Sequence, residues 1–242
     1  MRLGILQTGE INPIMGDGLP TYEDMFSNLF NLSVPEVDLT YIKVLEDEFP
    51  ASVDEYDAYL VTGSPSGVYD DDPWITPLMD FIREAFKAEK KLIGICFGHQ
   101  VIAEALGGKA EKSEKGWGIG VRSVNVTNHA GLIPDDTQSF NLLYMHQDQV
   151  TKLPPSAEVL ASDDFCPIAA FKINDQVLCM QGHPEFTPEV IDSIIDFRRD
   201  QIGEDTSAKG QASLSTPHEG IAVGKWFSTF LNKKNVAQSP SS

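Results

Sequence analysis

The segment Gly94-Ile95-Cys96-Phe97-Gly98 places a cysteine between two glycines, directly after an apolar run typical of a buried strand. A G-x-C-x-G pattern at a strand-to-helix turn is the thiol counterpart of the G-x-S-x-G nucleophile elbow. Glycines beside the nucleophile avoid Cβ clashes where the backbone turns sharply. The start of the following helix favours the thiolate, and the Phe97 amide can donate to a developing oxyanion. A single cysteine is more often a buried packing residue, but this context favours a nucleophile.

A thiol nucleophile needs a base, and the base needs an orienting group. Both are available in Gln181-Gly182-His183-Pro184-Glu185, at the end of another expected strand. Residues two apart project the same way from a strand, so Glu185 can accept a hydrogen bond from the His183 imidazole. With an elbow cysteine in the same chain, a catalytic triad of Cys96, His183 and Glu185 is a better interpretation than a surface histidine beside an unrelated glutamate.

The glycine-rich segment Thr62-Gly63-Ser64-Pro65-Ser66-Gly67 follows a third expected strand. Open α/β sheets bind ligands at the carboxyl ends of their strands, so this loop could supply a second oxyanion donor. By itself, it is more simply a turn. Residues 70–72 are three aspartates that suit helix capping better than metal binding, and the histidines lack metal-site spacing. Because no nucleotide-binding motif occurs either, we expect no metal and no cofactor.

Alternating strand and helix patterns position these segments. Apolar, β-branched runs indicate strands at residues 3–8, 37–44, 56–62 and 92–96. Helical patterns separate them at residues 22–32, 72–90 and 98–106. This alternation predicts an α/β fold with an open, mostly parallel central sheet and helices on both faces. After Trp117, strands follow in quick succession and predict an antiparallel or mixed extension of the sheet, at residues 119–127, 140–145, 158–161, 168–173 and 177–181.

The chain divides into four expected regions. A catalytic domain spans residues 1–202, and its last helix begins at Thr187-Pro188, a typical N-cap followed by proline. The polar residues 203–217 predict a loop. Residues 218–234 predict a helix whose apolar stripe packs on the domain. The polar residues 235–242 predict a disordered tail.

Composition narrows the functional classes. The chain has 242 residues and a formal net charge of −18, which disfavours binding to nucleic acid or anionic lipid. No signal peptide or membrane-length apolar run is visible. The three cysteines form no C-x-x-C pair, so neither a disulfide framework nor a thiolate zinc site is indicated. We therefore expect a cytoplasmic protein without a nucleic-acid or membrane partner.

Taken together, Gly94 to Gln100, His183-Pro184-Glu185 and Gly63-Ser64-Pro65 resemble the class I glutamine amidotransferases. The resemblance covers roughly residues 1–200. It is strongest for the amidotransferase domain of GMP synthase and its free-standing relatives, including the γ-glutamyl peptidases. It implies a class I amidotransferase fold and hydrolysis of a γ-glutamyl amide through a γ-glutamyl thioester.

By this resemblance, Cys96 attacks the γ-carbonyl, His183 transfers the proton and Glu185 orients the imidazole. The oxyanion would be held by the amides of Gly63 or Ser64 and of Phe97. The substrate's α-amino and α-carboxylate groups would be held by Gln100 and the backbone around Met145, His146, Gln147 and Asp148.

The resemblance implies that the substrate is glutamine or a γ-glutamyl peptide, and two other possibilities stay open. One is an amidotransferase subunit that works only with a separate synthetase, since this chain has no synthetase domain. The other is a regulatory relative without turnover, against which the complete triad argues. An α/β-hydrolase fits less well, because its acid normally precedes its histidine in the chain.

Overall fold

The structure is a computed structural model that describes residues 1–15 and 18–233. Within these residues the main sheet has nine strands, of which the first five in spatial order are parallel and the remainder antiparallel. In spatial order the strands are β2 (Asp38–Lys43), β1 (Arg2–Gln7), β3 (Ala58–Val61), β4 (Lys91–Ile95), β11 (Val177–Met180), β10 (Ala170–Ile173), β9 (Ala157–Ser162), β6 (Gly118–Val126) and β7 (Ser139–His146). The expected α/β fold, with its mostly parallel sheet and antiparallel extension, is confirmed.

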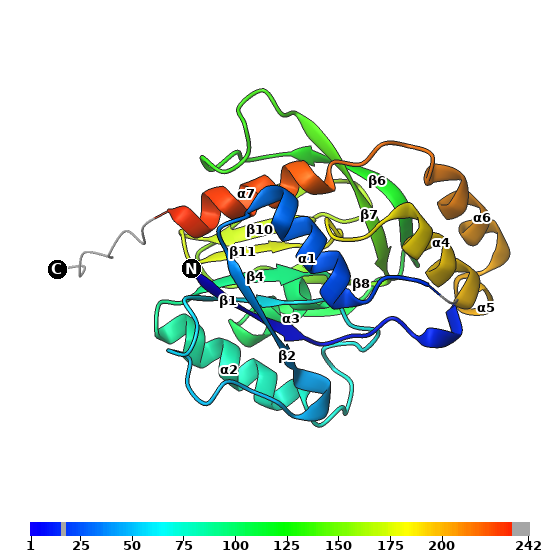
Figure 1. The fold of residues 1–242 in the computed structure, drawn as a ribbon. Coiled ribbons are helices and arrows are strands. Elements are labelled where there is room, and N and C mark those ends of the chain that lie inside the picture. Colours follow the sequence, from blue (N-terminus) through cyan, green and yellow to red (C-terminus); the bar gives the residue numbers. More distant parts are fainter. Residues whose placement is uncertain (16–17, 234–242) are drawn as a thin grey trace.

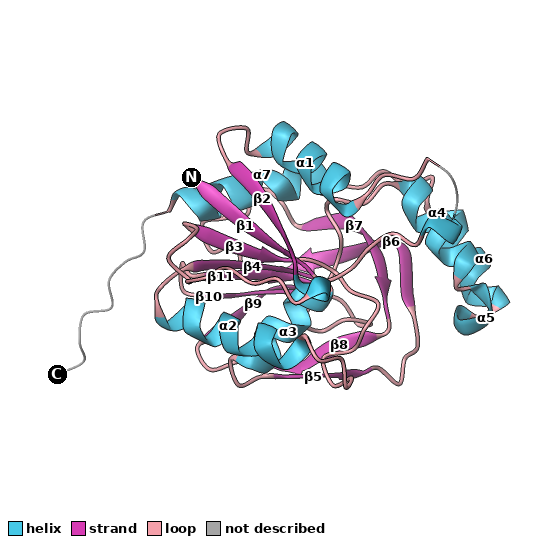
Figure 2. Ribbon diagram, turned by 60° about the horizontal axis from the view of Figure 1, so that its bottom comes forward, coloured by secondary structure: helices cyan, strands magenta, loops and turns pink. Residues whose placement is uncertain are grey.

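Helices cover both faces of the sheet, as Figures 1 and 2 show. One face carries α1 (Tyr22–Ser33) and α7 (Gly220–Asn232), and the other carries α2 (Ile75–Lys87) and α3 (Phe97–Ala105). Beside β6 and β7 lie α4 (Pro188–Phe197), α5 (Arg199–Ile202) and α6 (Glu204–Ser213). Short 3-10 helices occupy Pro13–Met15 and Val44–Glu46.

The core consists of two apolar layers separated by the sheet. β4 is buried along its whole length, which explains the apolar run that follows Lys91. The Phe30 and Phe227 rings join α1 to α7 with their centroids 6.3 Å apart. On the other face, the Tyr59 and Phe81 rings meet edge to face at 4.9 Å. Such pairs add to the stabilisation from apolar burial, so the strand ends are held on a well-packed support.

The sequence patterns do not predict a second, small sheet. β5 (Lys109–Lys112) pairs antiparallel with β8 (Asp148–Lys152). Both strands are short and rich in charged residues, so neither shows the apolar alternation of a typical strand. β8 begins two residues after β7 ends, and this tight connection carries the Met145 to Asp148 segment.

The prediction of a loop at residues 203–217 is wrong, because residues 204–213 form α6. This helix has no apolar stripe, and its buried residues are the small Ser207 and Gly210. A Cβ built on Gly210 would lie 2.6 Å from Ile119 Cδ1, so glycine is what lets α6 approach β6 this closely. Close backbone packing through small residues leaves no hydrophobic periodicity for sequence analysis to detect.

Two helix starts can be compared with their sequence signals. Thr187 caps α4 through its side chain, as expected, and accepts a hydrogen bond from the Val190 amide. By contrast, α2 begins at Ile75, three residues after the start of the helical pattern expected at residues 72–90. The Asp72 carboxylate instead accepts a hydrogen bond from the Ser66 hydroxyl at 2.7 Å.

The C-terminal helix occupies Gly220–Asn232 and packs on α1. The predicted tail at residues 235–242 lies outside the described residues. None of the helices in residues 1–15 and 18–233 is both long and apolar enough to cross a membrane.

Candidate active site

Cys96 stands at a strained turn between β4 and α3. Its φ of +53° and ψ of −104° are unusual for a residue with a side chain. Such strain, held in place by a packed scaffold, is typical of functional sites. A Cβ on Gly98 would lie 2.1 Å from the Val61 carbonyl oxygen, and one on Gly94 would lie 2.6 Å from the Gly98 carbonyl oxygen. Both glycines of the G-x-C-x-G pattern are therefore sterically required.

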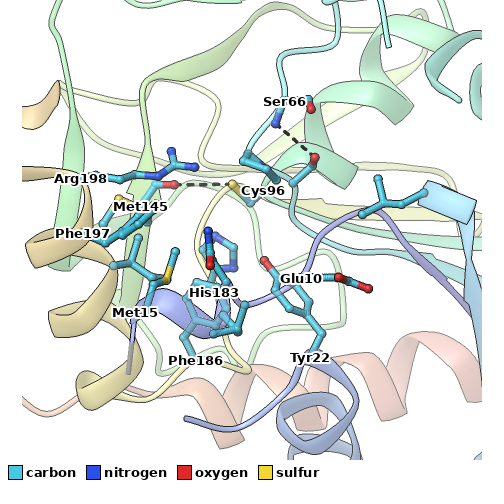
Figure 3. Close-up of a pocket in the computed structure, with 16 residues that line it drawn as sticks. Glu10, Met15, Tyr22, Ser66, Cys96, Met145, His183, Phe186, Phe197 and Arg198 are labelled. Atoms are coloured by element: carbon cyan, nitrogen blue, oxygen red, sulfur yellow. Dashed lines mark hydrogen bonds between the residues drawn. The ribbon is translucent and has the colours of Figure 1, made fainter. Parts of the chain in front are cut away.

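The sheet brings the histidine to the cysteine. β11 is the parallel neighbour of β4, with Met180 opposite Ile95, so the two strands end side by side. The backbone amide of His183 donates to the Leu143 carbonyl, which fixes the chain just beyond β11. Cys96 and His183 consequently line the same cavity (Figure 3).

Glu185 is placed to orient the imidazole. Its Oε1 lies 2.7 Å from His183 Nδ1, and both side chains are almost completely buried. The His183 ring also stacks on Phe186 with centroids 4.0 Å apart. With Nδ1 engaged, Nε2 is the ring nitrogen left for proton transfer.

Electrostatics favour the charged imidazole. Burial by itself lowers the pKa of His183, but the Glu185 carboxylate and the Cys96 sulfur outweigh it and raise this pKa above its usual range. An imidazolium paired with a thiolate is the reactive form of many cysteine hydrolases. The site therefore favours a positively charged imidazole beside the sulfur.

The other two thiols have a different environment. Burial raises the pKa of Cys166 to about 12 and places that of Cys179 well above its usual range. Both are consequently neutral at physiological pH and poor nucleophiles.

The glycine-rich loop after β3 lies against Cys96 and His183. A Cβ built on Gly63 would fall 2.9 Å from His183 Cε1 and 3.7 Å from Cys96 Cβ. The Thr8 hydroxyl lies 3.2 Å from the Gly63 carbonyl, to which it donates. In a trans peptide the carbonyl and the following amide point in opposite directions, so the Ser64 N–H faces away from Thr8.

Two aspartates hold the far end of this loop. The Asp70 carboxylate accepts from the Gly67 amide at 2.7 Å, and Asp72 binds Ser66 as described above. Their role is structural. Among the described residues, no cluster of three or more histidine, cysteine, aspartate or glutamate side chains could hold a metal ion.

A cavity of about 520 Å³ opens beside the sulfur. Ser64, Pro65 and Ser66 form one part of its wall. Much of the remainder comes from the segment after β1, from α1 and from α4 with its C-cap, namely Glu10, Ile11, Asn12, Met15, Tyr22, Ile194, Phe197 and Arg198. Figure 3 shows Arg198 beside Met145 on one side of Cys96, with Glu10 and Tyr22 on the other.

Sequence reasoning misses most of this wall. Segment 10–15 carries no motif, and Phe197 and Arg198 look like ordinary residues at a helix end. The only available signal is position, since residues after β1 also lie at the carboxyl edge of the sheet. Tyr22 is buried in the wall, and burial raises the pKa of its phenol, as do the nearby Glu185 and Cys96. It therefore stays protonated and can donate a hydrogen bond.

The predicted substrate-binding residues are only partly in the cavity. Met145 lines it, and its carbonyl oxygen lies 4.0 Å from the Cys96 sulfur. Gln100 and His146 are buried and do not line the cavity, and both donate to the Asp148 carbonyl at 2.9 Å. Gln147 and Asp148 are half-buried. Their assignment to substrate binding stays a prediction.

Two buried histidines make folding sensitive to acid. Burial lowers the pKa of His99 to about 3 and that of His146 to about 4. Between pH 6.5 and 4, these imidazoles bind protons in the unfolded chain but stay neutral in the native state. The free energy of unfolding therefore falls as the pH falls. One pKa unit corresponds to about 1.4 kcal/mol, so each histidine is expected to cost about 2 kcal/mol on going to pH 5.

Urea unfolding at pH 7.5 and pH 5.0, compared between wild type and His99→Gln, measures this effect. The variant is expected to lose about 2 kcal/mol less than wild type on acidification. The raised pKa of His183 acts in the opposite direction, because its stabilising contribution is fully present below pH 6.5 and lost at higher pH. That contribution is common to both proteins and cancels in the comparison. An equal pH response of the two proteins would contradict the prediction for His99.

Comparison with known proteins identifies the class. The family described as glutamine amidotransferase class-I matches residues 27–199. The chain belongs to this family, and the expectation of an enzyme of glutamine amidotransferase type is confirmed.

Individual proteins with similar sequences or structures support the same family. The chain is 34% identical over 183 residues to γ-glutamyl peptidase 3 of Arabidopsis thaliana, covering 72% of this chain and 73% of that protein. It is 33% identical over 156 residues to a putative glutamine amidotransferase-like protein of Schizosaccharomyces pombe, covering 64% and 61%. The solved structure of a glutamine amidotransferase from Thermotoga maritima superposes with a TM-score of 0.77 at 17% identity, covering 96% of this chain and 98% of that one. At that identity, the superposition supports the fold alone.

Proposed function

We propose that this protein hydrolyses γ-glutamyl peptides with Cys96 as nucleophile, His183 as general acid and base, and Glu185 as the group that orients and stabilises the imidazolium. The observation that carries this proposal is the buried His183–Glu185 pair beside a strained cysteine in a cavity that extends well past the sulfur. Every cavity residue lies between positions 10 and 198, within the expected catalytic domain of residues 1–202.

In the proposed reaction, the Cys96 thiolate attacks the γ-carbonyl carbon, and the carbonyl oxygen becomes an oxyanion. The Phe97 amide, at the first turn of α3, has no acceptor within its helix and can donate to this oxygen. The Ser64 amide is the second donor. His183 then gives its proton to the leaving nitrogen, the C–N bond breaks, and the γ-glutamyl thioester remains. A water molecule deprotonated by His183 attacks the thioester and releases glutamate and the thiolate.

The cavity favours a peptide over glutamine as substrate. The leaving group from glutamine is ammonia. Ammonia is too small to contact the apolar part of the wall formed by Ile11, Met15 and Phe197. Arg198 also lies in this wall, and among the described residues no carboxylate is within salt-bridge distance of it. The guanidinium stands over the Trp117 ring, 5.9 Å from the ring centroid. Stacking on an aromatic face leaves its N–H groups free for an anion, so Arg198 is suited to bind an anionic substrate group. We assign it to the free carboxylate of the leaving peptide.

Glutamate release from three compounds tests this function and the role of Arg198. The purified full chain is expected to turn over glutathione, whose leaving dipeptide carries a carboxylate, faster than glutamine or a γ-glutamyl anilide. Arg198→Gln is expected to lower kcat/KM for glutathione by about 10- to 100-fold, because a charge-assisted hydrogen bond contributes about 1.5–3 kcal/mol. Hydrolysis of the anilide, which has no carboxylate in its leaving group, should change less than about twofold.

Arg199→Gln is the matched control, since Arg199 pairs with Asp196 and Glu204 outside the cavity. It should leave all three rates unchanged. An equal loss on all three compounds in Arg198→Gln would move Arg198 to the glutamyl half of the site. No release above a Cys96→Ala blank from any compound would favour the alternative, a subunit that acts only with a separate synthetase.

A further inference from the structure

A series of hydrogen bonds between two buried side-chain amides connects the nucleophile to the backbone carbonyl of Asp148. Gln181 directly follows β11 and is completely buried. Its Nε2 lies 3.5 Å from the Cys96 sulfur, to which it donates. Its Oε1 accepts a hydrogen bond from Gln100 Nε2 at 3.1 Å. Gln100 Nε2 in turn donates to the Asp148 carbonyl at 2.9 Å.

The direction of this series of hydrogen bonds follows from chemistry, because a carbonyl oxygen can only accept. The Asp148 carbonyl therefore requires an N–H from Gln100, which sets the orientation of that amide. The same nitrogen faces Gln181, so Gln181 must present its oxygen there. Its NH2 group is then directed at the sulfur. A backbone carbonyl thus determines, through two amides, that the nucleophile is contacted by a donor.

The Asp148 carbonyl also accepts a second hydrogen bond. His146 Nδ1 lies 2.9 Å from the Asp148 carbonyl. Burial lowers the pKa of His146 to about 4, so the ring is neutral and its proton resides on Nδ1, where the carbonyl requires a donor. Both lone pairs of the Asp148 carbonyl oxygen then accept a hydrogen bond, one from His146 and one from Gln100. The hydrogen bond to this carbonyl fixes the orientation of the Gln100 amide.

We propose that Gln181 is a catalytic residue that stabilises the Cys96 thiolate by hydrogen bonding, and that Gln100 is a positioning residue that keeps the Gln181 amide turned toward the sulfur. This proposal rests on the proposed role of Cys96 as nucleophile. A donor binds an anionic sulfur more strongly than a neutral one. Gln181 therefore favours the thiolate before attack and again when the thioester breaks and the electron pair returns to sulfur. Unlike His183, Gln181 does not titrate, so its contribution is present at every pH.

The rate of Cys96 alkylation by iodoacetamide as a function of pH tests this without any substrate. The adduct on the Cys96 peptide is quantified by mass spectrometry in wild type and in Gln181→Met, which keeps the chain length and removes the donor. The pH of half-maximal alkylation is expected to rise by about one unit, because a hydrogen bond to a charged group contributes about 1.5 kcal/mol or more. Gln176→Met is the matched control, since Gln176 precedes the same strand and binds the Phe86 carbonyl, away from the cavity. Its midpoint should equal that of wild type.

Gln100→Met separates positioning from a structural role. It leaves the Gln181 amide in place but frees it to turn, so a smaller rise in the midpoint is expected. Unchanged midpoints in both folded variants would overturn the proposal. If neither variant folds, side-chain amide NMR of the wild type decides, because a glutamine NH2 signal must shift with the same midpoint as Cys96 alkylation. The absence of such a signal would overturn the proposal. A failure of γ-glutamyl hydrolysis would appear in the glutamate assay and leave this measurement intact.

Discussion

Cys96→Ala is expected to reduce glutamate release by at least about 10⁴-fold while leaving the fold intact, because loss of the nucleophile removes the covalent route. Alanine retains the Cβ, so the strain at the elbow is unchanged and no larger cavity is created than the sulfur leaves. Initial rates with saturating substrate measure the loss. A thermal melt followed by circular dichroism verifies that the variant is folded.

Cys166→Ala is the control for this loss. Cys166 is buried and has a pKa raised to about 12, so its removal should lower stability slightly and leave turnover unchanged. An electrophilic glutamine analogue should label Cys96 in wild type and nothing in Cys96→Ala. Substantial hydrolysis by Cys96→Ala would exclude the proposed mechanism, whatever the labelling pattern.

Glu185→Gln is expected to lower kcat by about 10³- to 10⁴-fold with little change in KM, by analogy with loss of the acid in other triads. Glu185 raises the pKa of His183 against the effect of burial. Without the Glu185 charge, one of the two groups that raise this pKa is lost, so the pKa falls. The imidazolium that protonates the leaving nitrogen is then depleted at neutral pH. The remaining activity should therefore respond to pH differently from wild type.

Glu189→Gln provides the matched control, because it makes the same change at an exposed position on α4 four residues later. It should preserve kcat and alter only the stability of the first helical turn, by less than about 1 kcal/mol. If Glu185→Gln has the same kcat and pH profile as wild type, another acid orients His183.

The candidate triad could be predicted from sequence because its determinants are local. The elbow is encoded by two glycines around Cys96, since the close approaches of Gly94 and Gly98 exclude a side chain. His183 and Glu185 are two residues apart, so the short segment between them sets their geometry. The alternation of apolar runs and helices likewise predicts a mostly parallel sheet. It does not predict the strand order, because β11 pairs in parallel with β4 although more than 80 residues separate them in the chain.

Other features depend on segments that meet only in the folded protein. The wall that carries Arg198 faces the loop at residues 64–66 because α4 and the segment after β1 converge on one cavity. α6 packs through Gly210 and Ser207 without an apolar stripe. The amide of Gln181 turns toward Cys96 because the Asp148 carbonyl, on another strand, can only accept a hydrogen bond. The sequence by itself determined which residues could do the chemistry, through steric and local hydrogen-bonding rules that act within a few residues. Only the tertiary structure decided what surrounds them, because packing and hydrogen-bond direction are settled between residues far apart in the chain.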